Sequence, residues 1–253
     1  MNKKEEFQKC FPEPQGLYHP QNEHDACGVG FICNLHGKKS HDIIHHALEI
    51  LVRLTHRGAC GCDPLTGDGA GILLQIPHAF YKKECDKLGI NLPAEQEYGT
   101  GLVFLPQDEA QRAACIEILE QAIAEEGQKL LGWRTVPTCN RLIGETARAS
   151  EPHIMQVFIG RGKGVSDPRT FDRMLYIIRK VAENRIFHSD LTNKADFYIP
   201  TLTCRIIIYK GLLLPEQMEF YYPDLLDDDF TSALALVHQR YSTNTFPAWK
   251  LAQ

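Results

Sequence analysis

The chain has 253 residues, 43% of them hydrophobic and 23% charged, and carries a formal net charge of −5 at pH 7. This length is enough for one large domain with a buried core, whereas the acidic balance argues against a protein that grips nucleic acid through clustered Lys and Arg. No run approaches the roughly 18 consecutive apolar residues of a membrane span, and the N-terminus lacks the apolar core of a secretory signal, so we expect a cytoplasmic protein that acts on small molecules.

The N-terminal part divides into a polar leader and an apolar strand. Residues 1–22 carry three prolines and a glycine among polar residues, a composition that resists regular structure. Residues 27–35, CGVGFICNL, are apolar and contain glycine, which predicts a buried strand whose backbone other groups can approach closely. This strand begins at Cys27.

A helix is predicted over residues 40–56, with Ser40 as its N-cap and Gly58 at its stop. Its apolar residues recur at three- and four-residue spacing: Ile43, Ala47, Leu48, Leu51 and Leu54. Residues 58–71 hold five glycines and a proline and are therefore expected to form a loop, and residues 71–77 resume as a strand. We expect so glycine-rich a loop to serve a site by ordering over a bound substrate.

From residue 99 onward the sequence predicts both strands and helices. Ile, Val, Phe and Tyr content predicts strands near residues 99–105, 153–159, 196–200, 202–210 and 232–242. Helices are predicted near 108–126 and 168–187, the second with Asp167 as its cap and Pro168 in its first turn. Consecutive strands toward the end indicate antiparallel sheet, so we expect an α+β fold and not a doubly wound parallel sheet.

The nine cysteines are odd in number and lack framework spacing, which favours reduced thiols over a disulfide scaffold. Cys60 and Cys62, with His56 nearby, would make half of a zinc site, but no second pair follows at ligand spacing, so no metal is expected. Residues 67–71, GDGAG, are a weak candidate for a phosphate cradle because they precede a strand and lack the Lys of a P-loop.

Three segments carry the most specific signal: NEHDACGVGF around Cys27, THRGACGCDPLTGDGAGI from Thr55 to Ile72, and HQRYSTNTFPAW from His238 to Trp249. Together they resemble the class II glutamine amidotransferases, and their sequences are most similar to the glutamate synthase branch of that class. The resemblance spans nearly the whole chain. It implies a four-layer αββα sandwich of the N-terminal nucleophile hydrolase type, apparently truncated at its C-terminal end.

In that family a short propeptide is cleaved directly before a cysteine, and Cys27 matches this cysteine. A terminal cysteine places an α-amino group, with a pKa of about 7.7 to 8.0, next to its own thiol as a general base. An internal cysteine has an amide nitrogen instead, which accepts no proton at neutral pH. The resemblance therefore implies that residues 1–26 form a propeptide and residues 27–253 the amidotransferase domain.

The resemblance also assigns substrate-binding residues. Arg240 matches the arginine that holds the substrate carboxylate, a task suited to the planar guanidinium, and Arg57 matches an arginine close to the nucleophile. Thr243 and Trp249 are expected to line the same pocket. Outside the motif, a single arginine is as readily a surface ion pair.

The activity implied is hydrolysis of L-glutamine to glutamate and ammonia, with the ammonia passed to 2-oxoglutarate in glutamate biosynthesis and nitrogen assimilation. This chain would hold no cofactor, whereas FMN and an iron–sulfur cluster are expected in synthase domains of the large subunit outside it, with a small reductase subunit as a further partner. The family's oxyanion-hole Asn-Gly pair and an aspartate for the substrate amino group are expected past Gln253. Since each lost oxyanion donor typically costs about 100- to 1,000-fold in rate, we expect impaired activity in the chain alone.

Two other interpretations stay open from the sequence. The chain would act only as a binding or assembly module if it were an inactive fragment. Alternatively, it would be an amidotransferase domain that serves a different acceptor, such as an amino sugar or a phosphoribosyl substrate.

Overall fold

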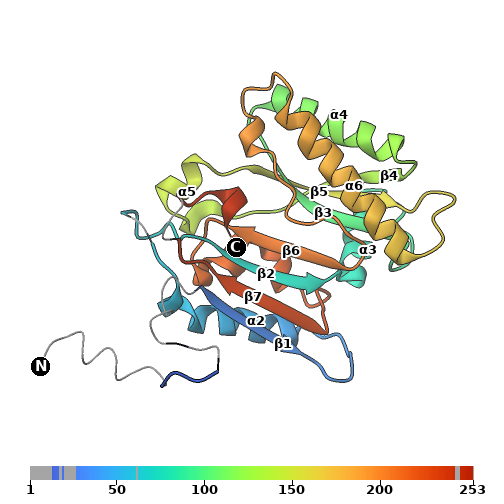
Figure 1. Ribbon diagram of the computed structural model, residues 1–253. Coiled ribbons are helices and arrows are strands. Elements are labelled where there is room, and N and C mark those ends of the chain that lie inside the picture. The colour runs from blue at the N-terminus through green and yellow to red at the C-terminus, as the bar shows by residue number, and fades with distance from the viewer. Residues whose placement is uncertain (1–12, 17–18, 20–26, 61, 243–245, 253) are drawn as a thin grey trace, which may run out of the picture.

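Two antiparallel β-sheets form the frame of the protein (Figure 1). The computed structural model describes residues 13–16, 19, 27–60, 62–242 and 246–252. A four-stranded sheet has the order β1-β7-β2-β6, and a three-stranded sheet has the order β3-β5-β4. The strands are β1 Gly28–Cys33, β2 Ala70–Gln75, β3 Tyr98–Leu105, β4 Lys129–Thr135, β5 His153–Gly160, β6 Ile206–Gly211 and β7 Leu234–Gln239.

Helix α2 (Asp42–Arg53) covers one face of the four-stranded sheet. Its Ile44 and Leu51 are fully buried and share a core with Ile72 of β2 and Val237 of β7. The residues that alternate with these point to the opposite face, where the side chain of Phe31 is 73% exposed. The second face is therefore open at β1, whereas toward β6 it is covered, since Lys210 is 3% exposed there.

Helices α4 (Glu109–Glu125) and α6 (Pro168–Phe187) lie together on one face of the three-stranded sheet (Figure 1). Leu119 and Leu175 pack there against alternate residues of β3 and β5. The other face joins the larger core, where helix α3 (His78–Lys87) places the ring of Tyr81 edge-on at 5.6 Å from that of Phe158.

Short elements connect these layers. They are α5 Glu145–Ala149, α7 Met218–Tyr221, and the 3-10 turns η2 Thr55–Arg57, η3 Asn140–Leu142, η4 Lys194–Asp196, η5 Pro215–Gln217, η6 Pro223–Leu226 and η7 Trp249–Leu251. Within the described ranges, no helix is both long and apolar enough to cross a membrane.

The α+β class and the antiparallel pairing predicted from the sequence are confirmed. The helix predicted over residues 168–187 has those bounds, because Asp167 caps it: its Oδ1 accepts from the backbone nitrogens of Arg169 and Thr170 at 2.9 and 3.1 Å. The helix near 108–126 and the strands near 99–105 and 153–159 are confirmed within one or two residues.

Three local predictions are wrong. The strand predicted to be buried over residues 27–35 spans Gly28–Cys33 and is open on one face, because Val29 and Phe31 are 59% and 73% exposed. Ser40 does not cap α2, because its backbone pairs with that of Ser232 and the helix starts at Asp42, with His41 in the cap position. Residues 196–200 are not a strand: they follow the turn η4 and touch β3 only through an isolated bridge between Phe104 and Tyr198.

A buried ion pair connects strand β4 to the turn η6. The guanidinium of Arg134 on β4 donates two hydrogen bonds to the carboxylate of Asp224, at 2.6 and 2.8 Å, and both side chains are at most 5% exposed. Tyr209 of β6 donates to the same carboxylate at 2.8 Å. A buried charge needs such a partner, because desolvation otherwise costs several kcal/mol.

We expect the substitution Asp224→Asn to lower the free energy of unfolding by about 3–5 kcal/mol, because it leaves the buried Arg134 guanidinium with only the Glu84 carboxylate, at 3.8 Å, as a counter-charge. Urea unfolding followed by circular dichroism measures this. The matched control is Glu125→Gln, which removes an exposed carboxylate paired with Arg185 and should leave the midpoint almost unchanged. Equal midpoints for the two variants would contradict the prediction.

Candidate functional site

Cys27 lies directly before β1, and its side chain is half-buried. The backbone nitrogen of Tyr241 donates to its Sγ at 3.4 Å, and Sγ lies 3.8 Å from the Tyr241 carbonyl oxygen. These residues are 214 positions apart in the sequence. The thiol is thus held against the backbone that follows β7.

The antiparallel pairing of β1 with β7 brings the first and third sequence segments together. Gly28 stands opposite Gln239 in the register, so Cys27 lies beside the residues that leave the end of β7. Those residues, Arg240 and Tyr241, belong to the segment HQRYSTNTFPAW. The sheet therefore places the predicted nucleophile next to the predicted carboxylate-binding arginine in the fold.

The second segment, from Thr55 to Ile72, packs against the ends of β1 and β7 beside Cys27. A methyl group at Gly58 would lie 1.9 Å from Nε2 of Gln239, and one at Gly28 would lie 3.0 Å from Cβ of Arg57. Only a residue without a side chain lets the Gly58 backbone approach Gln239 this closely. The loop that carries Arg57 is therefore packed directly on the β1 and β7 ends.

Asp68 and Gly69 hold the chain after β7 in place. The carbonyl oxygen of Gly69 accepts from the backbone nitrogen of Arg240 at 2.9 Å, and Oδ2 of Asp68 accepts from that of Ser242 at 2.5 Å. Asp68 is 5% exposed. Gly69 has φ +138°, a conformation that L side chains rarely adopt, which explains glycine at this position.

The side chain of Arg240 is oriented by hydrogen bonds to two further residues. Its Nη1 donates to the carbonyl oxygen of Leu251 at 2.6 Å, and its Nη2 lies 3.3 Å from Oγ of Ser242. Leu251 is the last residue of η7. The position of the guanidinium therefore depends on where η7 is anchored.

Trp249 supplies that anchor through contacts in the core. It is 5% exposed, its Nε1 donates to the Ala147 carbonyl oxygen at 2.9 Å, and its ring meets that of Phe104 edge-on at 6.2 Å. None of its described contacts is with Cys27, Arg57 or Arg240, because the indole points into the core. Thr243 lies outside the described residues.

Two residues beside Cys27 were not singled out from the sequence. Gln239 is 1% exposed and its Oε1 has no hydrogen-bond partner among the described residues. Asp68 fixes Ser242 as described above. Both lie inside the three quoted segments, so the segments marked the site, but only the folded contacts show what each residue does there.

His238 lies just before Gln239 on β7. Burial, followed by the positive charges of Arg240 and Lys210, lowers the pKa of its imidazole. In the described part of the chain, no group of three or more His, Cys, Asp or Glu side chains is placed to hold a metal ion.

Comparison with known proteins agrees with this arrangement. Residues 27–253 match the family of class II glutamine amidotransferases. The chain is 50% identical to the glutamate synthase [NADPH] large chain of Bacillus subtilis over 241 residues, which covers 95% of this chain and 16% of that protein. It is 45% identical to the glutamate synthase [NADPH] large chain of Azospirillum brasilense, covering 93% and 15%, and 43% identical to the glutamate synthase [NADH] of Saccharomyces cerevisiae, covering 96% and 11%.

The chain thus spans about a sixth or less of the length of these relatives. The family match begins at Cys27, the residue on which the three sequence segments converge in the fold. The chain belongs to the class II glutamine amidotransferases.

Proposed function

We propose that the chain hydrolyses L-glutamine to L-glutamate and ammonia, with Cys27 as the nucleophile of a mature form that begins at this residue. The observation that carries the proposal is the convergence of three distant segments on the Cys27 thiol, which is held by Tyr241 and flanked by the Arg240 backbone. The family match over residues 27–253 supports residues 1–26 as a propeptide.

The chemistry follows from a cysteine at a chain terminus. Once residues 1–26 are removed, the free α-amino group of Cys27 takes the thiol proton, and the thiolate adds to the side-chain amide carbon of glutamine. The carbon–nitrogen bond then breaks and ammonia leaves with a proton returned by the amine. Water hydrolyses the resulting thioester, which releases glutamate and restores the thiol.

Arg240 is proposed to bind the α-carboxylate of glutamine, since a guanidinium fixed at two donors by Leu251 and Ser242 is pre-oriented for a charged ligand. Arg57 lies over the start of β1 and is proposed to line the same site. Thr243 is proposed as a further substrate contact. For Trp249, the core position supports a positioning role through η7 in place of a direct contact.

We further propose that the ammonia serves glutamate synthesis from 2-oxoglutarate, as the glutaminase part of a cytoplasmic glutamate synthase. The identity to glutamate synthases supports this. The described residues gather no set of three or more Cys, His, Asp or Glu and do not fit an iron–sulfur cluster, which we assign with FMN to other domains of the large subunit. A small reductase subunit is the proposed further partner.

We expect the form that begins at Cys27 to be alkylated by a γ-diazoketone analogue of glutamine, with the added mass on Cys27. Cys27→Ser should slow adduct formation by about 1,000-fold or more, because the attacking thiolate is gone. The matched control is Cys33→Ser, which removes an exposed thiol at the end of β1.

N-terminal sequencing defines the form that is used, and mass spectrometry locates the adduct. If the form with an intact Met1 reacted as fast as the trimmed form, the requirement for a terminal amine would be disproved. If neither form reacted, the chain would instead be a non-catalytic binding module.

Arg240→Lys, made in the Cys27→Ser background so that glutamine is not consumed, should raise the Kd for L-glutamine about tenfold. A lysine keeps the charge but loses the paired donors, and one hydrogen bond to a charged group is worth about 1.5–3 kcal/mol. Isothermal titration calorimetry measures the Kd. The control Arg53→Lys changes an exposed arginine on α2, and an equal Kd for both variants would refute the assignment.

Asp68→Ala should slow the alkylation of Cys27 about tenfold and lower the free energy of unfolding by about 1–3 kcal/mol, because the buried backbone nitrogen of Ser242 loses its acceptor. Alkylation kinetics and urea unfolding measure the two effects. Asp228→Ala removes an exposed carboxylate and serves as the control. An Asp68→Ala protein that reacts at the control rate would show that this contact does not position the site.

A further inference from the structure

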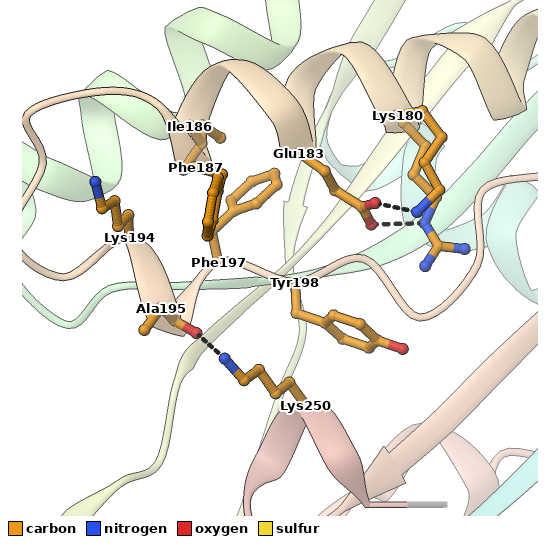
Figure 2. Close-up of a pocket in the computed structure, with 10 residues that line it drawn as sticks. Lys180, Glu183, Ile186, Phe187, Lys194, Ala195, Phe197, Tyr198 and Lys250 are labelled. Atoms are coloured by element: carbon orange, nitrogen blue, oxygen red, sulfur yellow. Dashed lines mark hydrogen bonds and ion pairs between the residues drawn. The ribbon is translucent and has the colours of Figure 1, made fainter.

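A cavity of ≈ 380 Å³ lies away from Cys27, between the second half of α6, residues 194–198 and Lys250 (Figure 2). Its volume falls in the range of small-molecule sites, which runs from about 300 to 1,000 Å³. None of its lining residues belongs to the set assigned to glutamine hydrolysis above. The cavity therefore requires a separate account, which does not depend on the proposed function.

The cavity is strongly positive in a chain whose net charge is −5. Four cationic side chains and one carboxylate line it, a formal charge of +3. The carboxylate, Glu183, already binds Arg179 at 2.8 Å and Lys180 at 2.6 Å, as Figure 2 shows. These three side chains together keep a formal charge of +1, and the other two lysines supply the remaining +2.

Lys194 and Lys250 have only uncharged oxygen partners within the described residues. Lys194 donates to the Ser189 carbonyl oxygen at 2.9 Å, and Lys250 lies 3.5 Å from that of Ala195 (Figure 2). Neither ammonium forms an ion pair in this part of the chain. A cleft lined by one sign of charge concentrates ligands of the other sign.

A third ammonium reinforces this field from behind the cavity. Lys210 is 3% exposed, donates to the Lys250 carbonyl oxygen at 2.9 Å and stands 4.5 Å from the centroid of the Tyr198 ring. Burial, followed by the positive charges of Arg179 and Arg240, lowers the pKa of Lys210 to about 8. An anion in the cavity would relieve this mutual repulsion.

The cavity also offers an apolar surface. The side chain of Phe187 is 69% exposed, and the Lys194 ammonium lies 6.0 Å from its ring centroid. The buried side chains of Ile186 and Phe197 form the wall behind it. A flat ring can stack on Phe187 while a charged group on that ring reaches the neighbouring ammonium.

We propose that this cavity binds a small anion that carries a flat apolar ring, with its ring on Phe187, its charged group beside the Lys194 ammonium, and the positive field of Lys250 adding to the attraction. Charge and ring are both required. A half-open cleft of this volume favours a small molecule over a folded partner.

Isothermal titration calorimetry of the 253-residue chain with three probes tests this: phenyl phosphate, inorganic phosphate and phenol. Phenyl phosphate is expected to bind at least about tenfold more tightly than either of the others, because only it presents both groups. Inorganic phosphate that binds as tightly as phenyl phosphate would overturn the role of the ring, and a failure of phenyl phosphate to bind would overturn the proposal.

Single substitutions assign the binding to this cavity. Lys194→Gln and Lys250→Gln should each weaken phenyl phosphate about fivefold, whereas Lys163→Gln, an exposed lysine outside the cavity, should not. Phe187→Ser should weaken phenyl phosphate and leave inorganic phosphate unchanged. Thermal unfolding verifies that each variant is folded, and equal affinities for the three lysine variants would sink the assignment.

The alternative that the cavity is a docking site for another protein is tested with a short peptide of acidic residues around one phenylalanine. We expect it to bind more weakly than phenyl phosphate. If it bound more than tenfold tighter, and lost that affinity in Lys194→Gln and Lys250→Gln, the cavity would be a docking site for another protein and the small-molecule proposal would be overturned.

Discussion

The antiparallel pairing of β1 with β7 determines which residues stand beside Cys27. With Gly28 opposite Gln239, the chain leaves β7 at the level of the thiol. Side chains alternate along a strand, so a slip of one residue would turn every side chain of β1 to the other face. The tight contact between Gly58 and the Gln239 side chain disfavours such a slip, because the loop and the strand end fit in only one register.

Stability and site geometry are carried by different sets of contacts. The core is held by apolar packing and by the buried pair of Arg134 with Asp224. The site is held by backbone hydrogen bonds from Arg240 and Ser242 to Gly69 and Asp68. The Arg240 side chain is oriented separately from these backbone contacts, by hydrogen bonds to Leu251 and Ser242.

Local sequence determined the parts of the fold whose signals are local. The helix over residues 168–187 was predicted to its ends because Asp167 and Pro168 mark its start and apolar residues mark its buried face. Residues 196–200 have the composition of a strand, but Pro200 lacks a backbone donor. The segment pairs with β3 at the isolated bridge between Phe104 and Tyr198. Helix α3 and strand β4 were not predicted from the sequence.

The candidate site was predictable in a different sense. Sequence motifs shared with a known family pointed to Cys27, Arg57 and Arg240. The contacts of Asp68, Gln239 and Trp249 are tertiary, and residue spacing in the sequence does not predict them. Trp249 illustrates the limit: its presence in a motif suggested a ligand contact, whereas the fold buries its indole in the core, where Nε1 donates to the Ala147 carbonyl oxygen.

The separation of 214 residues between Cys27 and Tyr241 has a consequence for the time at which the site comes into existence. A ribosome adds about 5–20 residues per second, so roughly 10 to 40 s pass between synthesis of the thiol and synthesis of its partner. During that interval β1 has no β7 to pair with. The nascent chain therefore carries an unassembled centre until the residues that follow β7 have been made.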